Sequence, residues 1–279
     1  MTNRRYATPF TMLHAASLLG QRSRLNKFKQ AIQEVVKVED YVVDIGTGSG
    51  ILAILAAKAG AGRVTAIDVN PESLRYAKRA AQMNGVDQVI EFVEGSFFEF
   101  VPKEKANIVI CEMLSSMMLV EQQIPASFHA TEKILRPDGV ILPQEVTVYI
   151  VPVECMEIWE RFQFEDLQFP RVVQTVSRDA ARDLAEMETL VTFDLRHLKQ
   201  DVSVSKTLHF TAVDKGTIHG LVGVFESKLF GDIHLKMEDG WKQLFIPLTQ
   251  PIKVETGDIF SISISYQPGK YDSLSIAVL

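Results

Sequence analysis

Cysteine and long apolar runs are scarce in this chain of 279 residues. Its two cysteines, Cys111 and Cys155, are too few for a disulfide framework or a zinc centre, so we expect a reducing, cytoplasmic setting and no bound metal. No apolar run is long enough to span a membrane, and the N-terminal stretch MTNRRYATPF lacks the apolar segment of a signal peptide. We therefore expect no membrane partner.

Excess positive charge is absent too. The net charge of −6 argues against nucleic acid as the main partner, because phosphate binding favours a basic surface. The same charge is compatible with a basic protein or peptide as the substrate. Nor is there an internal repeat or a low-complexity linker, so the parts of the chain are expected to pack against each other.

Two common glycine motifs are missing, and a third is present. The chain has neither the G-x-G-x-x-G of dinucleotide folds nor the Gly-Lys-Ser/Thr of phosphate loops. It has D-x-G-x-G-x-G over residues 44–50, between an apolar run at Tyr41–Val43 and a helical pattern from Ile51 to Ala59. A second apolar run, Val64–Ile67, ends at Asp68. This order predicts a strand–turn–helix–strand unit that binds a nucleoside.

The polar residues of this unit favour one nucleoside. Gly46, Gly48 and Gly50 would let the backbone turn tightly and approach a ligand. The Asp68 carboxylate, an acceptor with two oxygens, could hold both hydroxyls of a ribose. Asp44 would repel a pyrophosphate and suits a cationic ligand. S-adenosylmethionine carries a sulfonium and an ammonium group, so we expect it as the cofactor; the alternative is a turn without a ligand.

The remaining pattern predicts an α/β part followed by an all-β part. Strand and helix patterns alternate as far as about residue 150, which is typical of a parallel sheet covered by helices. Short β-type runs separated by Gly, Asp and Pro turns follow, as in a barrel or sandwich. The predicted elements of the first part are helices over 11–36, 71–84 and 127–135, the last ending at a turn over 136–139, and strands over 89–93, 106–111 and 140–142.

Two further segments lie at predicted strand ends, where such a sheet binds its ligand. Gly95, Ser96 and Phe97 follow one strand and could contact an adenine, although a plain turn fits equally well. Glu112 and Glu121 follow another strand in a mostly apolar stretch. Because an unpaired buried charge is costly, these carboxylates are expected to have a cationic partner. The alternative is that one glutamate caps a helix and the other is solvated.

From about Tyr6 to Gln267 the chain resembles the protein arginine methyltransferases. The matching segments are the cofactor motif VVDIGTGSGILAILAAKAGAGRVTAID, the double-glutamate loop CEMLSSMMLVEQ, the crossover LRPDGVILPQEVTVYIVPVE, and the barrel segments HGLVGVF and DGWKQLFIPLTQPIKVETGD. The resemblance implies a Rossmann-like class I methyltransferase domain over residues 1–145 and a β-barrel-like substrate domain over residues 146–279. It also implies an arm at about residues 164–190 through which two copies form a homodimer.

The resemblance implies a role for each matching residue. Glu112 and Glu121 would be the catalytic pair, which clamps the planar fork of a guanidinium and leaves one nitrogen facing the methyl group. Arg24 would pair with the carboxylate of the cofactor, and Tyr6 and Phe10 would fold over it. The implied cofactor-binding residues are Arg24, Asp44, Gly46, Thr47, Gly48, Gly50, Asp68, Val69, Gly95, Ser96, Phe97 and Glu112. The implied substrate-binding residues are Tyr6, Asp239 and Trp241.

The chain departs from the family at three places. Met113-Leu114-Ser115-Ser116 replaces Trp-Met-Gly-Tyr between the glutamates, which removes two aromatic walls. Glu238-Asp239-Gly240-Trp241 replaces Thr-His-Trp, which keeps the tryptophan and loses the histidine, and Asp239 could stand in for the histidine as an acceptor. Gln21 takes the place of an acidic residue.

These departures leave several functions open. A methyltransferase acting on arginine side chains of a protein is favoured. The same architecture could instead methylate lysine, another amine or a small molecule, or serve as a non-catalytic cofactor-binding interaction protein. A nucleic-acid methyltransferase is disfavoured by the charge and by the absence of an Asn/Asp-Pro-Pro-Tyr/Phe sequence.

Overall fold

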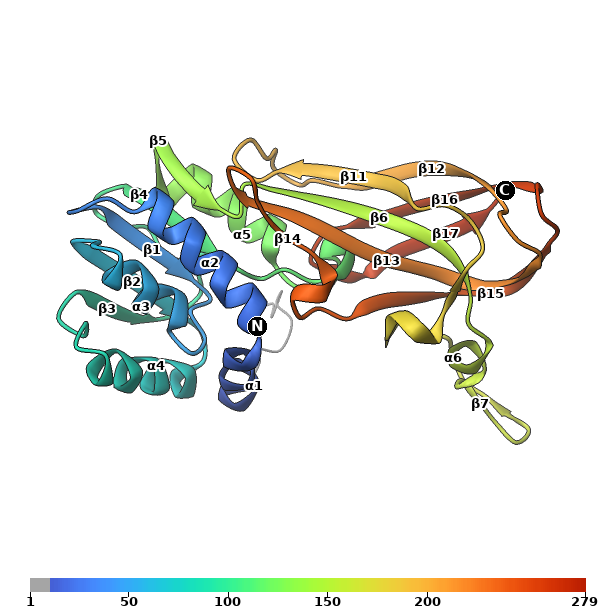
Figure 1. The fold of residues 1–279 in the computed structure, drawn as a ribbon, viewed down its shortest axis with the longest axis horizontal. Helices are drawn as coiled ribbons and strands as arrows, with labels where there is room; N and C mark the ends of the chain where they lie inside the picture. The colour runs from blue at the N-terminus through green and yellow to red at the C-terminus, as the bar shows by residue number, and fades with distance from the viewer. Residues whose placement is uncertain (1–10) are drawn as a thin grey trace.

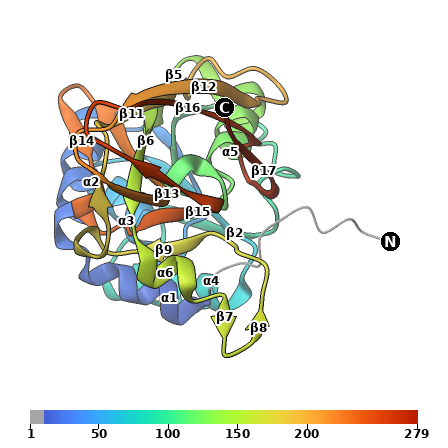
Figure 2. The same ribbon diagram turned by 90° about the vertical axis from the view of Figure 1, so that its right-hand side faces the viewer.

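The computed structural model describes residues 11–279 as an α/β part joined to a set of antiparallel sheets (Figure 1). Tyr6 and Phe10 lie outside the described residues. Figure 1 shows the long strands of the second part running away from the α/β part, and Figure 2 looks at the molecule from the end where these strands lie. The predicted fold class is therefore confirmed.

The α/β part is built on a parallel sheet of five strands in the order β3-β2-β1-β4-β5. Its strands are β1 (Tyr41–Ile45), β2 (Arg63–Asp68), β3 (Ile90–Glu94), β4 (Ala106–Cys111) and β5 (Leu135–Leu142). The order reverses between β1 and β4, and such a switch point opens a crevice at the carboxyl ends of the two strands. The glycine loop follows β1 and Glu112 follows β4, so the topology places both at this crevice.

Helices pack on this sheet and around its edge. They are α1 (Met12–Ser17), α2 (Arg22–Val35), α3 (Ile51–Lys58), α4 (Pro71–Met83) and α5 (Gln123–His129). Asn70 caps α4 by accepting from the backbone N–H groups of Glu72 and Ser73, and Pro71 occupies the first turn. The single helix predicted over 11–36 is wrong: a 3-10 turn at Leu18–Gly20 and a non-helical Gln21, with ψ of 72°, separate α1 from α2.

The helix predicted over 127–135 is present, but its predicted start and the turn predicted over 136–139 are wrong. Helix α5 begins earlier, at Gln123, and continues as one π-helical turn over Ala130–Ile134. Residues 136–139 belong to β5, which is an edge strand and therefore tolerates Pro137. The guanidinium of Arg196 donates to the backbone carbonyls of Arg136 and Pro137, a contact from a distant part of the chain that no local pattern could show.

The second part, residues 145–279, is called the barrel after the family that it resembles, and it consists of antiparallel strands around β13, the longest of them. The strands are β6 (Glu145–Glu154), β9 (Gln174–Val176), β10 (Arg182–Asp183), β11 (Glu188–Asp194), β12 (Val204–Thr211), β13 (Gly216–Phe230), β14 (Ile233–Leu235), β15 (Gln243–Val254), β16 (Ile259–Gln267) and β17 (Lys270–Val278). One sheet has the order β10-β6-β13-β15-β9, with β11 on β6 and β14 on β13, and a second has the order β12-β16-β17.

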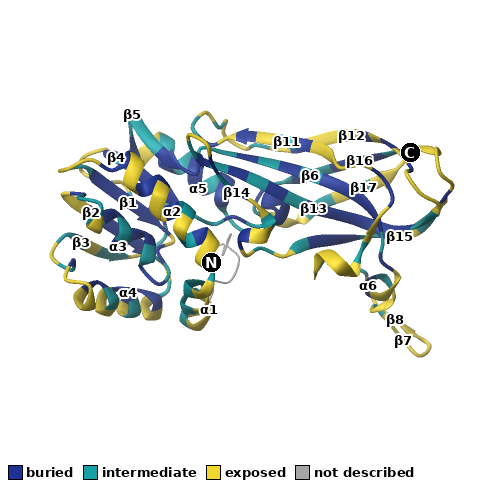
Figure 3. Cartoon of the chain, viewed as in Figure 1, coloured by how far each residue is buried: buried dark blue, intermediate teal, exposed yellow. Residues whose placement is uncertain are grey.

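One hydrophobic core continues through both parts of the molecule (Figure 3). It joins residues of the parallel sheet, such as Ile110, to Met117 and Met118 and to barrel residues such as Phe225 and Ile264. No helix in residues 11–279 has the length and apolar character needed to cross a membrane.

A segment between β6 and β10 projects from the large sheet (Figure 1). It contains α6 (Met156–Glu160) and a hairpin of β7 (Gln163–Phe164) and β8 (Leu167–Gln168). The arm predicted at about 164–190 extends further in sequence than this projection, since β9, β10 and the start of β11 pair with strands of the sheet.

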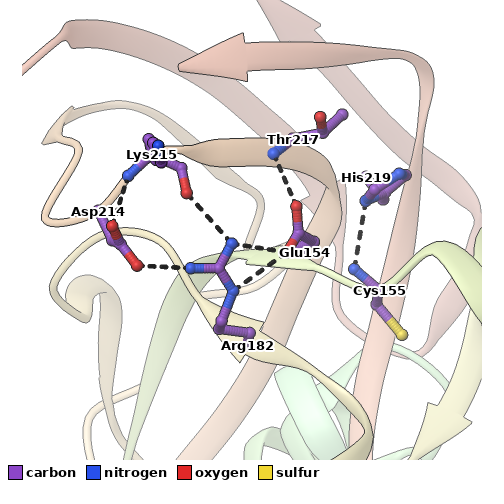
Figure 4. Close-up of polar contacts among 7 residues, drawn as sticks. All are labelled: Glu154, Cys155, Arg182, Asp214, Lys215, Thr217 and His219. Atoms are coloured by element: carbon purple, nitrogen blue, oxygen red, sulfur yellow. Dashed lines mark hydrogen bonds and ion pairs between the residues drawn. The ribbon is translucent and has the colours of Figure 1, made fainter. Parts of the chain in front are cut away.

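An ion-pair network ties together the two ends of this projecting segment (Figure 4). Glu154, at the end of β6, accepts from Arg182 Nε at 3.0 Å and Nη2 at 2.6 Å, and Arg182 lies on the returning strand β10. Arg182 Nη1 also donates to Asp214 at 2.6 Å, and the Thr217 N–H donates to the other Glu154 oxygen at 2.9 Å. These contacts therefore fix the two points at which the projecting segment joins the sheet.

Candidate active site

A cavity of about 1080 Å³ lies where the carboxyl ends of β1, β2 and β4 meet α2 and the barrel. It brings together most of the residues predicted for the site. Those that line it are Arg24, Gly46, Thr47, Gly48, Asp68, Val69, Gly95, Ser96, Phe97, Glu112, Glu121 and Trp241. Gly50, Asp44 and Asp239 are absent from this lining.

The glycine loop owes its shape to backbone conformation. Gly46, Gly48 and Gly50 have φ of +71°, +52° and +78°, a region that favours glycine. A Cβ on Gly50 would also lie 2.7 Å from the Cβ of Ala77, so Gly50 allows close packing on α4 and does not face the cavity. The loop is held to β2 because the N–H groups of Gly46 and Thr47 both donate to Ile67 O at 2.9 Å.

Asp68 stands at the end of β2 with its carboxylate at the cavity wall. One oxygen accepts from the Gly48 N–H and the other from the Asn70 N–H, each at 2.8 Å. Burial raises the pKa of this carboxyl above its ordinary value, against those hydrogen bonds. Each oxygen keeps acceptor capacity, so a pair of ribose hydroxyls fits this group.

Asp44 does not lie where it was predicted. Its buried carboxylate points behind the loop, where it accepts from Thr47 Oγ1 at 2.6 Å and from the Ala53 N–H in the first turn of α3 at 3.1 Å. Burial raises its pKa to about 7. Asp44 therefore holds the loop on the helix and does not line the cavity.

The segment after β3 forms another wall. The Gly95 N–H donates to Asp68 O at 3.0 Å, which ties this wall to the end of β2. Phe97 is buried and packs on Phe98 with a centroid distance of 4.1 Å. A backbone edge beside an apolar face suits an adenine ring, as predicted from the sequence.

Glu112 and Arg24 form an ion pair in the cavity. The Arg24 guanidinium also lies over the ring of Trp241, with Cζ 4.3 Å from the centroid, and Trp241 Nε1 donates to Leu114 O at 2.9 Å. Burial lowers the pKa of Arg24 to about 10, while the charge of Glu121 acts in the opposite direction. Arg24 is thus a fixed cation at the meeting point of α2, the glutamate loop and the barrel.

Glu121 is the more available of the two glutamates. Burial raises its pKa to about 7, although the charge of Arg24 opposes the shift. Within residues 11–279 no hydrogen-bond donor contacts its carboxylate, whereas Glu112 also accepts from the Leu114 N–H at 3.2 Å. A half-buried carboxylate without donors attracts a cation that brings its own.

Barrel residues that the sequence did not identify hold the glutamate loop. Met117 and Met118 have φ of +62° and +53° and are completely buried. Tyr266 Oη donates to Met117 O at 2.8 Å, and the Gly269 N–H donates to Met118 O at 2.9 Å. Such a backbone is strained and persists only where its surroundings enforce it. In the sequence, only the apolar residues between the two glutamates indicated that this loop would be buried.

Asp239, like Asp44, was predicted to contact a ligand but does not line the cavity. It lies under the cavity wall and accepts from Lys27 Nζ at 2.6 Å and from the hydroxyl of Ser23, both on α2. These donors occupy its carboxylate, so it does not act as a free acceptor for substrate. Trp241, two residues further on, does line the cavity.

Comparison with known proteins divides the chain at the same boundary as the structure. Residues 29–149 match the family model described as ribosomal protein L11 methyltransferase (PrmA). Residues 145–270 match the model described as PRMT5 oligomerisation domain. The first match covers the parallel sheet and the second covers most of the barrel.

Relatives extend over both parts. An uncharacterized protein of Methanocaldococcus jannaschii is 30% identical over 80% of this chain and 87% of its own length. Protein arginine N-methyltransferase 1 of Dictyostelium discoideum is 28% identical over 81% of this chain and 73% of its own. The arginine N(omega)-methyltransferase of Streptomyces achromogenes is 26% identical over 90% and 75%.

A solved structure shares the fold. The Trypanosoma brucei PRMT1 enzyme-prozyme heterotetrameric complex with AdoHcy contains a chain that superimposes with a TM-score of 0.81 at 22% identity, over 94% of this chain and 91% of that one. Together with the glycine loop, the Asp68 carboxylate and the double-glutamate loop, the sequence matches show that the chain belongs to the protein arginine methyltransferase family and is an S-adenosylmethionine-dependent methyltransferase.

Proposed function

We propose that this protein methylates the guanidinium of an arginine, with a side chain of a protein or peptide as its substrate. The observation that carries the proposal is the pair Glu112 and Glu121 on one cavity, whose other end holds the glycine loop and Asp68. A guanidinium is always charged and presents five donors in a plane, so two carboxylates suit it better than they suit an ammonium.

The residues present fit the cofactor. Asp68 has acceptor capacity for ribose hydroxyls, the wall at 95–97 suits an adenine, and Arg24 is a buried cation within the cavity for a carboxylate. When bound, S-adenosylmethionine supplies an electrophilic methyl group. The chain supplies the position of the acceptor nitrogen, and correct placement alone accounts for much of the acceleration in such transfers.

The two glutamates have different parts in this proposal. Glu112 is anchored by Arg24 and by the Leu114 N–H, so it sets the orientation of the guanidinium. Glu121 has no donor of its own among the described residues and so binds the guanidinium N–H groups directly. The acceptor nitrogen loses one proton overall when it gains a methyl group. With a pKa of about 7, the Glu121 carboxylate can take up that proton near neutral pH.

A second candidate is free arginine as the substrate. The Streptomyces relative is named for arginine itself. In this chain Met113 and Ser116 line the cavity beside the glutamates, in the place of the aromatic walls expected for the family. Trp241, which is retained, already stacks with Arg24. The wall that selects the rest of the substrate therefore differs from the family pattern.

The test is transfer of labelled methyl from S-adenosylmethionine to three acceptors: an arginine-rich peptide, its twin with lysine at every arginine, and free arginine. Hydrolysed products are identified by mass. We expect labelled methylarginine in the hydrolysed arginine-rich peptide. If only free arginine becomes labelled, the result supports free arginine as the substrate. Label in lysine alone contradicts both. An Asp68→Ala variant serves as the control for cofactor-dependent transfer.

We also propose that two copies pair through the projecting segment. Its apolar side chains Phe164, Leu167 and Phe169 are 65%, 55% and 54% exposed, and solvent-exposed patches of this kind mark interfaces. The matched family model at 145–270 describes an oligomerisation domain, and the structural neighbour is a heterotetrameric complex. The cytoplasmic location expected from the cysteine content stays a prediction.

Light scattering tests the pairing. A dimer is expected for the wild type and a monomer for Phe164→Ser/Phe169→Ser. Met83→Ser, at a residue 80% exposed on α4, is the control and is expected to stay dimeric. A wild-type monomer contradicts the proposal. Point variants are preferable to deletion of 164–190, because that deletion removes strands that pair in the sheet.

A further inference from the structure

One face of α2 contacts a short turn of the barrel directly beside the cavity. The turn is η5 (Met237–Asp239), and it leads straight into Trp241. From α2, Lys27 Nζ donates to Asp239 Oδ2 at 2.6 Å and the Ser23 hydroxyl donates to Oδ1. Arg24, on the same helix, stacks on Trp241. The helix thus contacts both the base of the turn and the indole that follows it.

Asp239 is the centre of these contacts. Its side chain is 2% exposed, and it also accepts from the Lys236 N–H at 2.8 Å, which closes the turn on itself. Burial by itself would raise the pKa of Asp239, but the hydrogen bonds from Lys27, Ser23 and the Lys236 N–H outweigh it and hold the pKa below its ordinary value. The carboxylate is therefore ionised at neutral pH, and Lys27 is the cation that balances it.

The backbone after Asp239 leaves Trp241 little freedom. Gly240 has φ of +130°, and a Cβ there would lie 2.5 Å from Gln21 Oε1. The Trp241 N–H donates to Met237 O at 2.9 Å, and its indole N–H reaches Leu114 O in the glutamate loop. A displacement of η5 would therefore shift the indole, and with it the surface on which Arg24 rests.

We propose that Asp239, paired with Lys27, is a positioning residue for the reaction. The pair fixes Trp241 between Arg24 and the glutamate loop, and so sets the barrel wall against the cofactor end of the cavity. This inference rests on the proposed function for its effect on turnover, but its effect on Trp241 can be measured without any substrate. Asp239 itself touches neither cofactor nor substrate in this proposal.

The test uses the two tryptophans of the chain. In a Trp159→Phe background, fluorescence emission reports on Trp241 alone. Lys27→Met removes the cation and leaves the buried carboxylate unbalanced, Lys27→Arg restores a cation, and Lys29→Met is the matched control at an exposed position of the same helix. Far-UV circular dichroism confirms that each variant is folded. Asp239→Asn is a second, near-isosteric variant.

Lys27→Met is expected to shift Trp241 emission to the red and to increase its quenching by iodide. It should also lower kcat/KM for an arginine-rich peptide by roughly 10- to 100-fold, the scale expected when reacting groups are misplaced by about an ångström. Lys27→Arg should restore both values, and Lys29→Met should change neither. Unchanged emission in folded Lys27→Met and Asp239→Asn, or the same change in Lys29→Met, would overturn the proposal. A wild type without turnover would refute the proposed function, and the emission comparison would still decide the positioning role.

Discussion

The two ends of the cavity are built in different ways. At the cofactor end, Gly48 and Asp68 are joined by a hydrogen bond between residues 20 apart in the sequence. At the substrate end, Tyr266 holds Met117 across 149 residues, and Ser116 donates to Lys242 O across 126. The cofactor site that we propose is a local unit, whereas the double-glutamate loop is held by contacts with the barrel. Substitutions at the two ends should therefore have separable effects on cofactor affinity and on turnover.

The largest expected effect belongs to the substrate end. Glu121→Gln should lower turnover by about 10²- to 10³-fold, because it removes the charge that holds and deprotonates the guanidinium. The dissociation constant for S-adenosylmethionine, measured by calorimetry, should stay within about twofold, a change of under 0.5 kcal/mol. Glu238→Gln, at an exposed position near the cavity wall, is the control. Retained turnover in Glu121→Gln would end the clamp hypothesis.

The reciprocal substitution is at the cofactor end. Asp68→Ala removes an acceptor of charge-assisted hydrogen bonds, each contributing about 1.5–3 kcal/mol, so cofactor affinity should fall by roughly 100-fold. The control is Glu94→Ala, which removes the carboxylate paired in register with Asp68 at the end of β3 but outside the cavity lining. Unchanged affinity by calorimetry would show that the ribose site is wrongly assigned.

Lowering the pH should reduce turnover by protonating Glu121 at the substrate end of the cavity. Glu121 must be ionised to hold a guanidinium, and its pKa is raised from 4.5 to about 7. We therefore expect kcat/KM to rise about tenfold per pH unit below 7 and to level off above it. A flat profile from pH 5 to 8, measured under initial-rate conditions, would contradict this role.

The same shift has a consequence for stability. A carboxyl whose pKa is raised in the folded state keeps its proton between pH 4.5 and 7 while the unfolded chain releases it. This group therefore lowers the free energy of unfolding as the pH rises through that window. Glu121→Gln removes this contribution, so the variant should be more stable than the wild type above pH 7, by about 3 kcal/mol. Urea unfolding of both proteins at pH 5 and pH 8 measures the difference.

The smallest effect tests how the barrel holds the loop. Tyr266→Phe removes the hydroxyl that donates to Met117 O and leaves that buried carbonyl without this partner, at a cost of about 1 kcal/mol in the free energy of unfolding. Turnover should fall by a few-fold, since a partner that positions the loop is lost, and cofactor affinity should not change. Tyr271→Phe, at a partly exposed position on β17, is the control. A loss of cofactor affinity in Tyr266→Phe would mean that the two ends are not separable.

What could be predicted from the sequence follows the same division. The glycine loop, the Asn70 cap and the carboxylate at the end of β2 depend on neighbouring residues, and the structure places all three as expected. Asp44 was assigned to the ligand because its charge suits a sulfonium, but the helix behind the loop satisfies it instead. A charge that suits a ligand does not reveal which way its side chain points.

The wrong predictions at the substrate end of the cavity have a common cause. Asp239 was expected to face the substrate, yet two side chains of α2, more than 200 residues away, occupy it. Gln21, where the predicted helix breaks, lies against Gly240, and Arg196 donates to Pro137 O in the strand that replaces the predicted turn. No local pattern records such contacts, so the sequence identified the double-glutamate loop without showing what holds it.

The most direct test of the central claim, that Glu112 and Glu121 make a guanidinium site, is the wild-type selectivity between the arginine-rich peptide and its lysine twin. Initial rates of labelled methyl transfer are measured at equal peptide concentration and saturating S-adenosylmethionine. We predict that the arginine peptide is methylated at least about 100-fold faster, because a site built around paired acceptors discriminates strongly by hydrogen bonding. Equal rates, or a faster reaction with lysine, would contradict the claim.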